Sequence, residues 1–178
     1  KCFKELNKIA QAPFTCFFKH EVLYAIGSSP ERFLKKQGNQ LLSQPIKGTA
    51  KRDLDPIADN KLKAKLKENP KEISENVMIV DLVRNDLSRI AKKGSVNVEE
   101  LCKIYSYKQV HQMVSTISAQ LRNDASLSEI LRATFPMGSM TGAPKISSMQ
   151  IIGDLEATKR GLYSGCIGYV TPELDFDF

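Results

Sequence analysis

Residues 28–51 read SSPERFLKKQGNQLLSQPIKGTAK, and the rest of the chain is organised around them. Two short runs with apolar residues flank a turn at 37–39, a pattern typical of a β-hairpin. Such a hairpin would bring Glu31, before the first strand, close to Lys47, after the second. An acid and an amine that face each other form a candidate catalytic pair, although each residue alone is usually a solvated surface group.

Length and composition indicate one globular domain with its own core. The 178 residues are 42% hydrophobic and 26% charged, which is typical of globular domains. No apolar run approaches the roughly 20 residues of a transmembrane helix, so no membrane partner is expected. The chain begins at Lys1 without a methionine and stops at Phe178 inside a strand-like pattern, so we expect it to be a piece of a longer protein.

Cysteine usage and charge restrict the possible partners. The four cysteines are far apart and the chain has two histidines, so neither a zinc site nor a disulfide framework is expected. Reduced thiols are typical of a cytosolic protein, and the predicted location is cytoplasmic. The net charge of +6 suits nucleic acid or a small anionic substrate. The lysine cluster at 61–71 has the spacing of a solvated helix face, so nucleic acid is not an expected partner.

Strand patterns precede and alternate with helix patterns, which predicts an α+β fold with antiparallel sheet. Besides the hairpin above, the segments predicted to be extended are 14–19, 21–26, 95–107, 110–121 and 164–170. A turn-rich connection is expected over 53–60, and a short helix over 126–133.

The sequence Asn69-Pro70-Lys71-Glu72 predicts the start of a long helix. Asn69 can cap it, Pro70 fits the first helical position, and Glu72 can reach back to the amide of the cap. We expect the helix to run to about Lys93, before Gly94. Its inward stripe consists of Ile79, Val83, Leu87 and Ile90.

Three polar features leave alternatives open. Glu75 lies one turn before the inward stripe, so it is either at the helix edge, which the residues alone favour, or held inside by a cation. His111 alone is more often a structural or surface residue than a catalytic one. Residues 135–145 open a helix whose free amides could receive an anion. A strand-to-helix turn is the simpler interpretation, because the spacing is not that of a Walker motif.

Several segments in this order resemble the chorismate-utilising enzymes. They are SSPERFL (28–34), PIKGT (45–49), ENVMIVDLVRNDLSRI (75–90), HQMVSTI (111–117), FPMGSMTGAPK (135–145) and RGLYSGCIGY (160–169). The resemblance implies an α+β fold with antiparallel, orthogonally packed sheets flanked by helices. Residues 1–178 would then be a chorismate-binding catalytic domain that lacks the N-terminal half and the C-terminal end of the family's chain.

The segment PIKGT is similar to the aminodeoxychorismate synthase branch, because other branches generally carry alanine at the position of Lys47. By this resemblance, Lys47 would add to C2 of chorismate while Glu31 protonates the leaving C4 hydroxyl. Ammonia from a glutamine amidotransferase would then displace the lysine and give 4-amino-4-deoxychorismate. The alternatives are anthranilate, isochorismate or salicylate synthesis within the family, and a catalytically inert binding module outside it.

The resemblance also implies further site residues. Glu75 matches a ligand of a Mg²⁺ cofactor, which favours the inward position for this carboxylate. Gln112 stands where the anthranilate branch has a histidine, so no histidine base is expected. The family's remaining metal and substrate ligands are expected beyond Phe178. The substrate-binding residues that the resemblance implies are Gly48, Thr49, Gln112, Ser139 and Tyr163.

Overall fold

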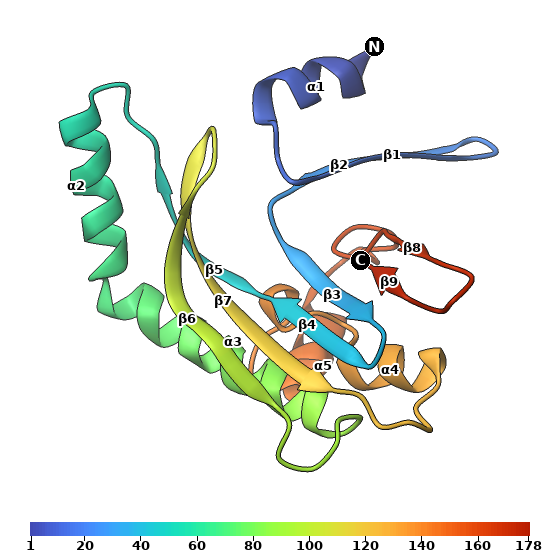
Figure 1. Ribbon diagram of the computed structural model, residues 1–178. Helices are drawn as coiled ribbons and strands as arrows, with labels where there is room; N and C mark the ends of the chain where they lie inside the picture. Colours follow the sequence, from blue (N-terminus) through green and yellow to red (C-terminus); the bar gives the residue numbers. More distant parts are fainter.

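The computed structural model describes residues 1–178, and all its paired strands are antiparallel, which confirms the α+β prediction (Figure 1). The helices are α1 (Cys2–Ala10), α2 (Pro56–Lys67), α3 (Pro70–Ser88), α4 (Leu127–Thr134), the 3-10 helix η1 (Gly138–Met140) and α5 (Lys145–Leu155). None of them is long and apolar enough to cross a membrane. The strands are β1 (Phe14–His20), β2 (Leu23–Ser29), β3 (Arg32–Gln37), β4 (Gln40–Gln44), β5 (Ile46–Lys51), β6 (Asn97–Ser106), β7 (Val110–Gln120), β8 (Tyr169–Val170) and β9 (Phe176–Asp177).

Strand β7 is the centre of the main sheet, whose order is β5-β7-β4-β3-β9-β8, and β6 also pairs with β7. Strands β4 and β5 pair with successive parts of β7. Pro45 separates them because proline has no amide hydrogen for the ladder, while its carbonyl accepts a hydrogen bond from the Ser115 amide at 3.1 Å. The orthogonal packing of two large sheets stays a prediction, since β1 and β2 form a sheet of only two strands.

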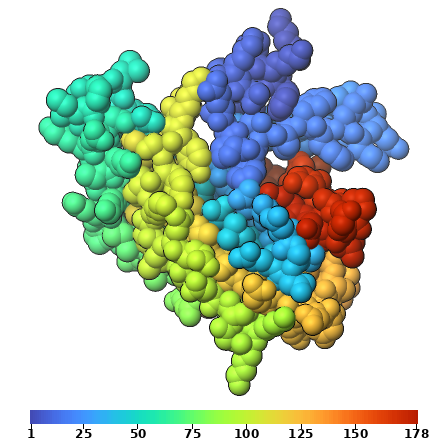
Figure 2. All heavy atoms as spheres, in the orientation of Figure 1, coloured from blue at the N-terminus to red at the C-terminus, as the bar shows by residue number.

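Both predicted hairpins are confirmed. Strands β1 and β2 pair along their whole length and project from the rest of the molecule (Figure 2). Strands β3 and β4 reverse at Gly38, which has φ 57° and whose amide donates to the Asp175 carboxylate at 2.9 Å. A left-handed backbone of this kind favours glycine. The turn therefore fixes the register that places Glu31 and Lys47 just beyond the paired segment.

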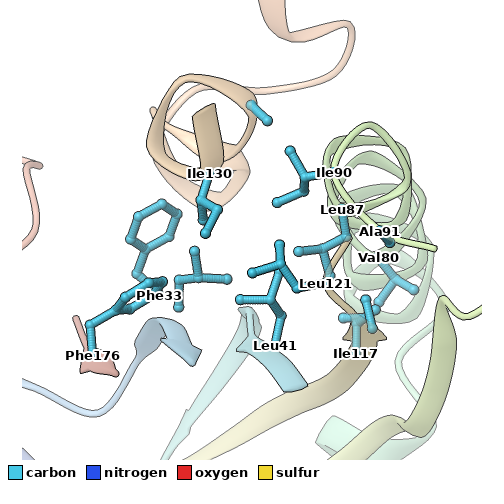
Figure 3. Close-up of a cluster of buried hydrophobic side chains, with 13 residues drawn as sticks. Phe33, Leu41, Val80, Leu87, Ile90, Ala91, Ile117, Leu121, Ile130 and Phe176 are labelled. Carbon is cyan, nitrogen blue, oxygen red and sulfur yellow. The ribbon is translucent and has the colours of Figure 1, made fainter. Parts of the chain in front are cut away.

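The hydrophobic core lies between the sheet and helices α3 and α4 (Figure 3). Leu41, Ile117 and Leu121 face this core from β4, β7 and the residue that follows β7, and Ile130 faces it from α4. The predicted stripe of α3 is confirmed: three of its members are buried and Val83 is half-buried against the cluster. The buried members are Ile79 and Leu87 on α3, and Ile90, which lies two residues beyond the end of the helix.

Asn69 caps the start of α3 as predicted, but the return bond from Glu72 and the end of the helix differ from the prediction. Asn69 accepts hydrogen bonds from the amides of Lys71 and Glu72 at 3.0 and 3.3 Å. The expected return bond from the Glu72 side chain is not formed, because the Asn69 amide donates to a carbonyl of α2. The helix stops at Ser88 rather than near Lys93. The backbone that follows joins the sheet, because the Lys92 amide donates a hydrogen bond to the Gln120 carbonyl at 2.7 Å.

Two sequence predictions of local structure were wrong. Residues 53–60 contain the start of α2, because Asp55 caps the amides of Ile57 and Ala58, each at 3.2 Å. The expected strand over 164–170 is reduced to β8 at its last two residues. The preceding segment is turned because Arg160 binds the Ser164 hydroxyl and its carbonyl accepts from the Tyr163 amide at 2.9 Å.

Replacing Asn69 with alanine should lower the free energy of unfolding by about 1 kcal/mol, because two amides at the start of α3 lose their acceptor. Asn85→Ala on the exposed face of the same helix is the control, and it should be neutral or slightly stabilising because alanine has the higher helix propensity. Urea unfolding of the full-length protein measures both. Equal effects of the two substitutions would contradict a capping role for Asn69.

Candidate active site

The candidate nucleophile Lys47 lies on a β-bulge. The pairing of β5 with β7 shifts between Ile46, opposite Val114, and Thr49, opposite Gln112. Two residues of β5, Lys47 and Gly48, thus stand against one of β7. Bulges of this kind bend a strand and redirect its side chains.

Gly48 is required at this bulge for two reasons. Its φ of 95° lies in the left-handed region, which side chains other than glycine's adopt at a cost. A Cβ atom added there would lie 3.2 Å from the Glu72 Cβ and 3.3 Å from the Met113 Cβ, tighter than ordinary contacts. Helix α3 therefore packs directly onto the bulge. The half-buried Lys47 is the neighbour of Gly48 in the bulge, so it lies next to this contact.

Buried Asn76 of α3 joins the bulge to β7. Its Nδ2 donates to the carbonyls of Lys47 and Met113 at 3.2 and 3.1 Å, and its Oδ1 accepts from the Ser115 hydroxyl. This residue was not among those predicted from the sequence. The sequence feature that could have identified it is a polar residue one turn before Ile79, on the inward face of α3.

Glu31 lies at the entrance to β3, where its amide donates to the Ser29 hydroxyl at 3.1 Å. The Ser139 hydroxyl donates to Glu31 Oε1 at 2.6 Å and links the hairpin to η1. Burial raises the pKa of the Glu31 carboxyl above its ordinary value of 4.5, although Ser139, the Ile46 amide and the charge of Lys47 each lower it. A carboxyl group whose pKa is raised in this way is better suited to general acid catalysis than an ordinary glutamate.

The structure thus brings the predicted pair together. Lys47 is close enough for its charge to act on the Glu31 carboxyl. Ser139 joins the pair by its hydrogen bond to Glu31. Three segments that are distant in sequence therefore converge, as expected from the sequence for Glu31, Lys47 and Ser139.

The remaining predicted substrate residues lie around this centre. Thr49 and Gln112 are direct neighbours across β5 and β7, and Gln112 Oε1 is buried without a hydrogen-bond partner. Tyr163 is exposed and shares with Ser139 the lining of a surface cavity of about 530 Å³. Arg160 also lines this cavity and donates to the Met140 carbonyl at 2.9 Å. The cavity has the size of a small-molecule site.

Glu75, the predicted Mg²⁺ ligand, is at the edge of α3. Its side chain is 40% exposed and lies 3.8 Å from Lys71 Nζ, as the residues alone suggested. Glu72 is one turn away, against Gly48. Residues 1–178 contain no group of three or more acidic, histidine or cysteine side chains that could hold a metal. Glu72 and Glu75, three residues apart on α3, still provide carboxylates of the kind that Mg²⁺ binds, since this ion uses few protein ligands together with substrate oxygens and water.

A buried ion pair behind the centre was not predicted from the sequence. Lys145 Nζ binds the Asp86 carboxylate and donates to the Thr134 carbonyl at 2.9 Å. The lysine of the loop 135–145 is therefore turned inward and fixes α3 to the start of α5. Asp86 and Glu31 both line a small cavity of about 20 Å³, large enough for one water molecule.

His111 is structural rather than catalytic. It is 1% exposed, and its ring nitrogens bind the Ser106 hydroxyl at 2.8 Å and the Asp59 carboxylate at 2.9 Å. Arg52 binds the same carboxylate, and its hydrogen bonds hold the pKa of Asp59 well below the ordinary value. This network attaches α2 to the sheet.

Replacing Glu31 with glutamine should stabilise the protein at pH 8 more than at pH 5. The raised pKa means that the folded state holds the Glu31 proton to a higher pH than the unfolded chain does. The resulting stability cost is absent below pH 4.5 and complete above the raised pKa. Glutamine removes this cost and still accepts the Ser139 hydrogen bond. Thermal unfolding of the full-length protein at both pH values measures the difference.

Glu99→Gln is the matched control for this experiment. The Ser118 hydroxyl lowers the pKa of Glu99, so that carboxylate stabilises the fold above its ordinary pKa and loses the effect as the pH falls. Glu99→Gln should therefore lower the melting temperature at pH 8. A Glu31→Gln protein that is less stable than the unmutated one at pH 8 would contradict the raised pKa.

Known proteins resemble this chain in sequence over nearly its whole length. The family model of the chorismate binding enzymes matches residues 1–178. The chain is 44% identical over 171 residues to aminodeoxychorismate synthase component 1 of Escherichia coli (strain K12), an alignment that covers 96% of this chain and 38% of that protein. It is 50% identical over 178 residues to the chloroplastic aminodeoxychorismate synthase of Arabidopsis thaliana, covering 98% of this chain and 19% of the relative.

A solved structure is also similar. Anthranilate synthase component I from Streptococcus pneumoniae TIGR4 superposes with a TM-score of 0.88 at 31% identity, covering 98% of this chain and 38% of that one. The chain thus spans well under half the length of the relatives it matches. Because the family model matches the whole sequence and the fold is shared, the chain belongs to the family of chorismate binding enzymes.

Proposed function

We propose that the full-length protein converts chorismate and ammonia to 4-amino-4-deoxychorismate. The observation that carries this proposal is the position of Lys47, on a bulge and near enough to the buried carboxyl of Glu31 for its charge to act on it. Relatives with the name aminodeoxychorismate synthase, at 44% and 50% identity, support the choice of reaction. Residues 1–178 would supply the nucleophile and the general acid of the complete domain.

In the proposed first step, the neutral amine of Lys47 attacks C2 of the chorismate ring. The ring double bonds shift, the C4–O bond breaks, and Glu31 gives its proton to the departing hydroxyl, which leaves as water. Hydroxide is a poor leaving group, so this proton is worth a factor of about 10²–10⁴ in rate. The attached lysine nitrogen releases a proton to solvent and becomes a secondary amine.

In the second step, ammonia attacks C4, the double bonds shift back, and the C2–N bond to Lys47 breaks. The departing lysine amine takes up a proton from solvent, which replaces the one released in the first step, and the ammonium group formed at C4 returns one to Glu31. The two steps together replace the hydroxyl with an amino group and release one water molecule. Lys47 and Glu31 end in their starting states, as a catalyst requires.

Other residues would bind and orient the substrate. Gln112 keeps a buried acceptor, Oε1, that no protein group uses, and it adjoins Thr49. Ser139 and Tyr163 would contact the ring and its enolpyruvyl carboxylate from the neighbouring cavity. Glu75, together with Glu72, would hold Mg²⁺, which when bound would neutralise the ring carboxylate of chorismate.

The partner in this proposal is a glutamine amidotransferase subunit or domain that delivers ammonia. The name component 1 of the Escherichia coli relative motivates it. The cytoplasmic location stays a prediction, since the Arabidopsis relative is named chloroplastic.

The second candidate is anthranilate synthesis, which the likeness to the Streptococcus pneumoniae structure favours. The product distinguishes the two functions, because both start from chorismate. A chorismate-binding protein without activity is the non-enzymatic alternative. Glu31 and Lys47 lie together in the fold, which favours an enzyme.

Lys47→Ala should abolish formation of 4-amino-4-deoxychorismate by the full-length protein supplied with chorismate, Mg²⁺ and ammonium. Lys51→Ala, an exposed lysine at the end of the same strand, is the matched control and should leave the rate unchanged. With ammonia withheld, the unmutated protein should gain the mass of chorismate less one water molecule on Lys47. Chromatography of products and peptide mass mapping make these measurements.

Several outcomes would contradict the proposal. Anthranilate or isochorismate as the product of the unmutated protein would select another branch of the family. Turnover that survives in Lys47→Ala would exclude the covalent step. A protein that binds chorismate without converting it would be the binding module.

A further inference from the structure

We propose that Asn76 is a positioning residue for Lys47: it holds the β-bulge in the one geometry that aims the lysine at the substrate. This inference rests on the proposed function, in which Lys47 is the nucleophile. Asn76 is 1% exposed and lies on α3, away from the pocket surface. It therefore acts through the backbone of Lys47 and not on the substrate.

At the bulge, the Lys47 carbonyl receives its hydrogen bond from Asn76. In a regular ladder, the strand partner satisfies each inward backbone group, but the pairing of β5 with β7 is interrupted at Lys47 and Gly48. The Lys47 carbonyl instead accepts from Asn76 Nδ2 at 3.2 Å. A buried carbonyl without a donor would carry an unfavourable desolvation free energy. This geometry of the bulge is therefore favoured over a slipped pairing that would rotate Lys47 away.

The same amide group sets the distance between the two strands. Its second hydrogen goes to the Met113 carbonyl at 3.1 Å, so one side chain spans β5 and β7 at the place where they separate. Glu72, one turn earlier on α3, packs on Gly48. Helix α3 thus fixes both residues of the bulge, one by a hydrogen bond and one by contact.

Ser115 fixes the orientation of the amide. Its hydroxyl accepts from the Cys102 amide at 2.9 Å and donates to Asn76 Oδ1. Carbonyl oxygens can only accept, so the Asn76 nitrogen must face Lys47 and Met113 while its oxygen faces the hydroxyl. Ser115 is fully buried, so water does not compete for these bonds. The amide therefore has one orientation.

A carboxylate in place of the amide reverses this effect. An aspartate side chain is nearly the same size but has no hydrogens to donate, so its oxygens would repel the carbonyls of Lys47 and Met113. The bulge would move, and a nucleophile displaced by about 1 Å loses about 100-fold in rate. Substrate groups that bind away from the bulge would keep their contacts, so the loss should fall on kcat and leave KM within about threefold.

The experiment compares Asn76→Asp, Ser115→Ala and Asn85→Asp in the full-length protein, with chorismate, Mg²⁺ and ammonium. Asn76→Asp should lower kcat about 100-fold and slow adduct formation on Lys47 by the same factor when ammonia is withheld. Ser115→Ala keeps both donations from Asn76 but frees its orientation, so it should lower both rates by about tenfold. Asn85→Asp makes the same chemical change on the exposed face of α3 and should alter neither rate.

The results separate this inference from the proposed function. If the unmutated protein forms the adduct and both Asn76→Asp and Ser115→Ala form it at the unmutated rate, the positioning role is wrong and the proposed function stands. If the unmutated protein forms product without an adduct on Lys47, the proposed mechanism fails and the inference with it. If Asn76→Asp does not fold, Ser115→Ala decides alone: an unchanged adduct rate in the folded variant overturns the inference, and a tenfold slower rate supports it.

Discussion

The site depends on one interruption in an antiparallel sheet. A strand of β-sheet satisfies its backbone by pairing along its length, and the two residues at Lys47 and Gly48 leave that pairing. Helix α3 compensates for this interruption at both residues. Asn76 donates a hydrogen bond to the Lys47 carbonyl, and Glu72 fills the space that a side chain on Gly48 would need. The strand can therefore hold a lysine at a fixed position on the bulge while the Lys47 carbonyl keeps a hydrogen-bond donor.

The acid of the site depends on the same packing. Glu31 precedes β3, so the turn at Gly38 and the register of β3 with β4 set its distance from Lys47. Burial raises the pKa of its carboxyl, and the Ser139 hydroxyl donates to one of its oxygens. Ser139 is held in turn near the start of α5, which the buried pair of Asp86 and Lys145 ties to α3. Helix α3 therefore supports both halves of the candidate pair.

Sequence patterns predicted the hairpins, the capped start of α3 and the convergence of Glu31 with Lys47, because turns, caps and alternating residues act over a few positions. They did not predict the role of Asn76 or the pairing of Asp86 with Lys145, since those contacts join residues 29 to 59 positions apart. The expected strand over 164–170 failed because Arg160 imposes a turn through its own contacts. The resemblance named most site residues, but it contained no information about what holds them in place.

A crystal structure of the full-length Glu31→Gln protein with chorismate bound would test the positions of acid, lysine and bulge together, because this variant should retain substrate but not turn it over. We expect Lys47 Nζ in contact with C2 of the intact ring, the substituted amide side chain at the C4 hydroxyl, and Asn76 still donating to the Lys47 carbonyl. A ring bound elsewhere, or a Lys47 side chain directed away from C2 with the bulge intact, would contradict this arrangement.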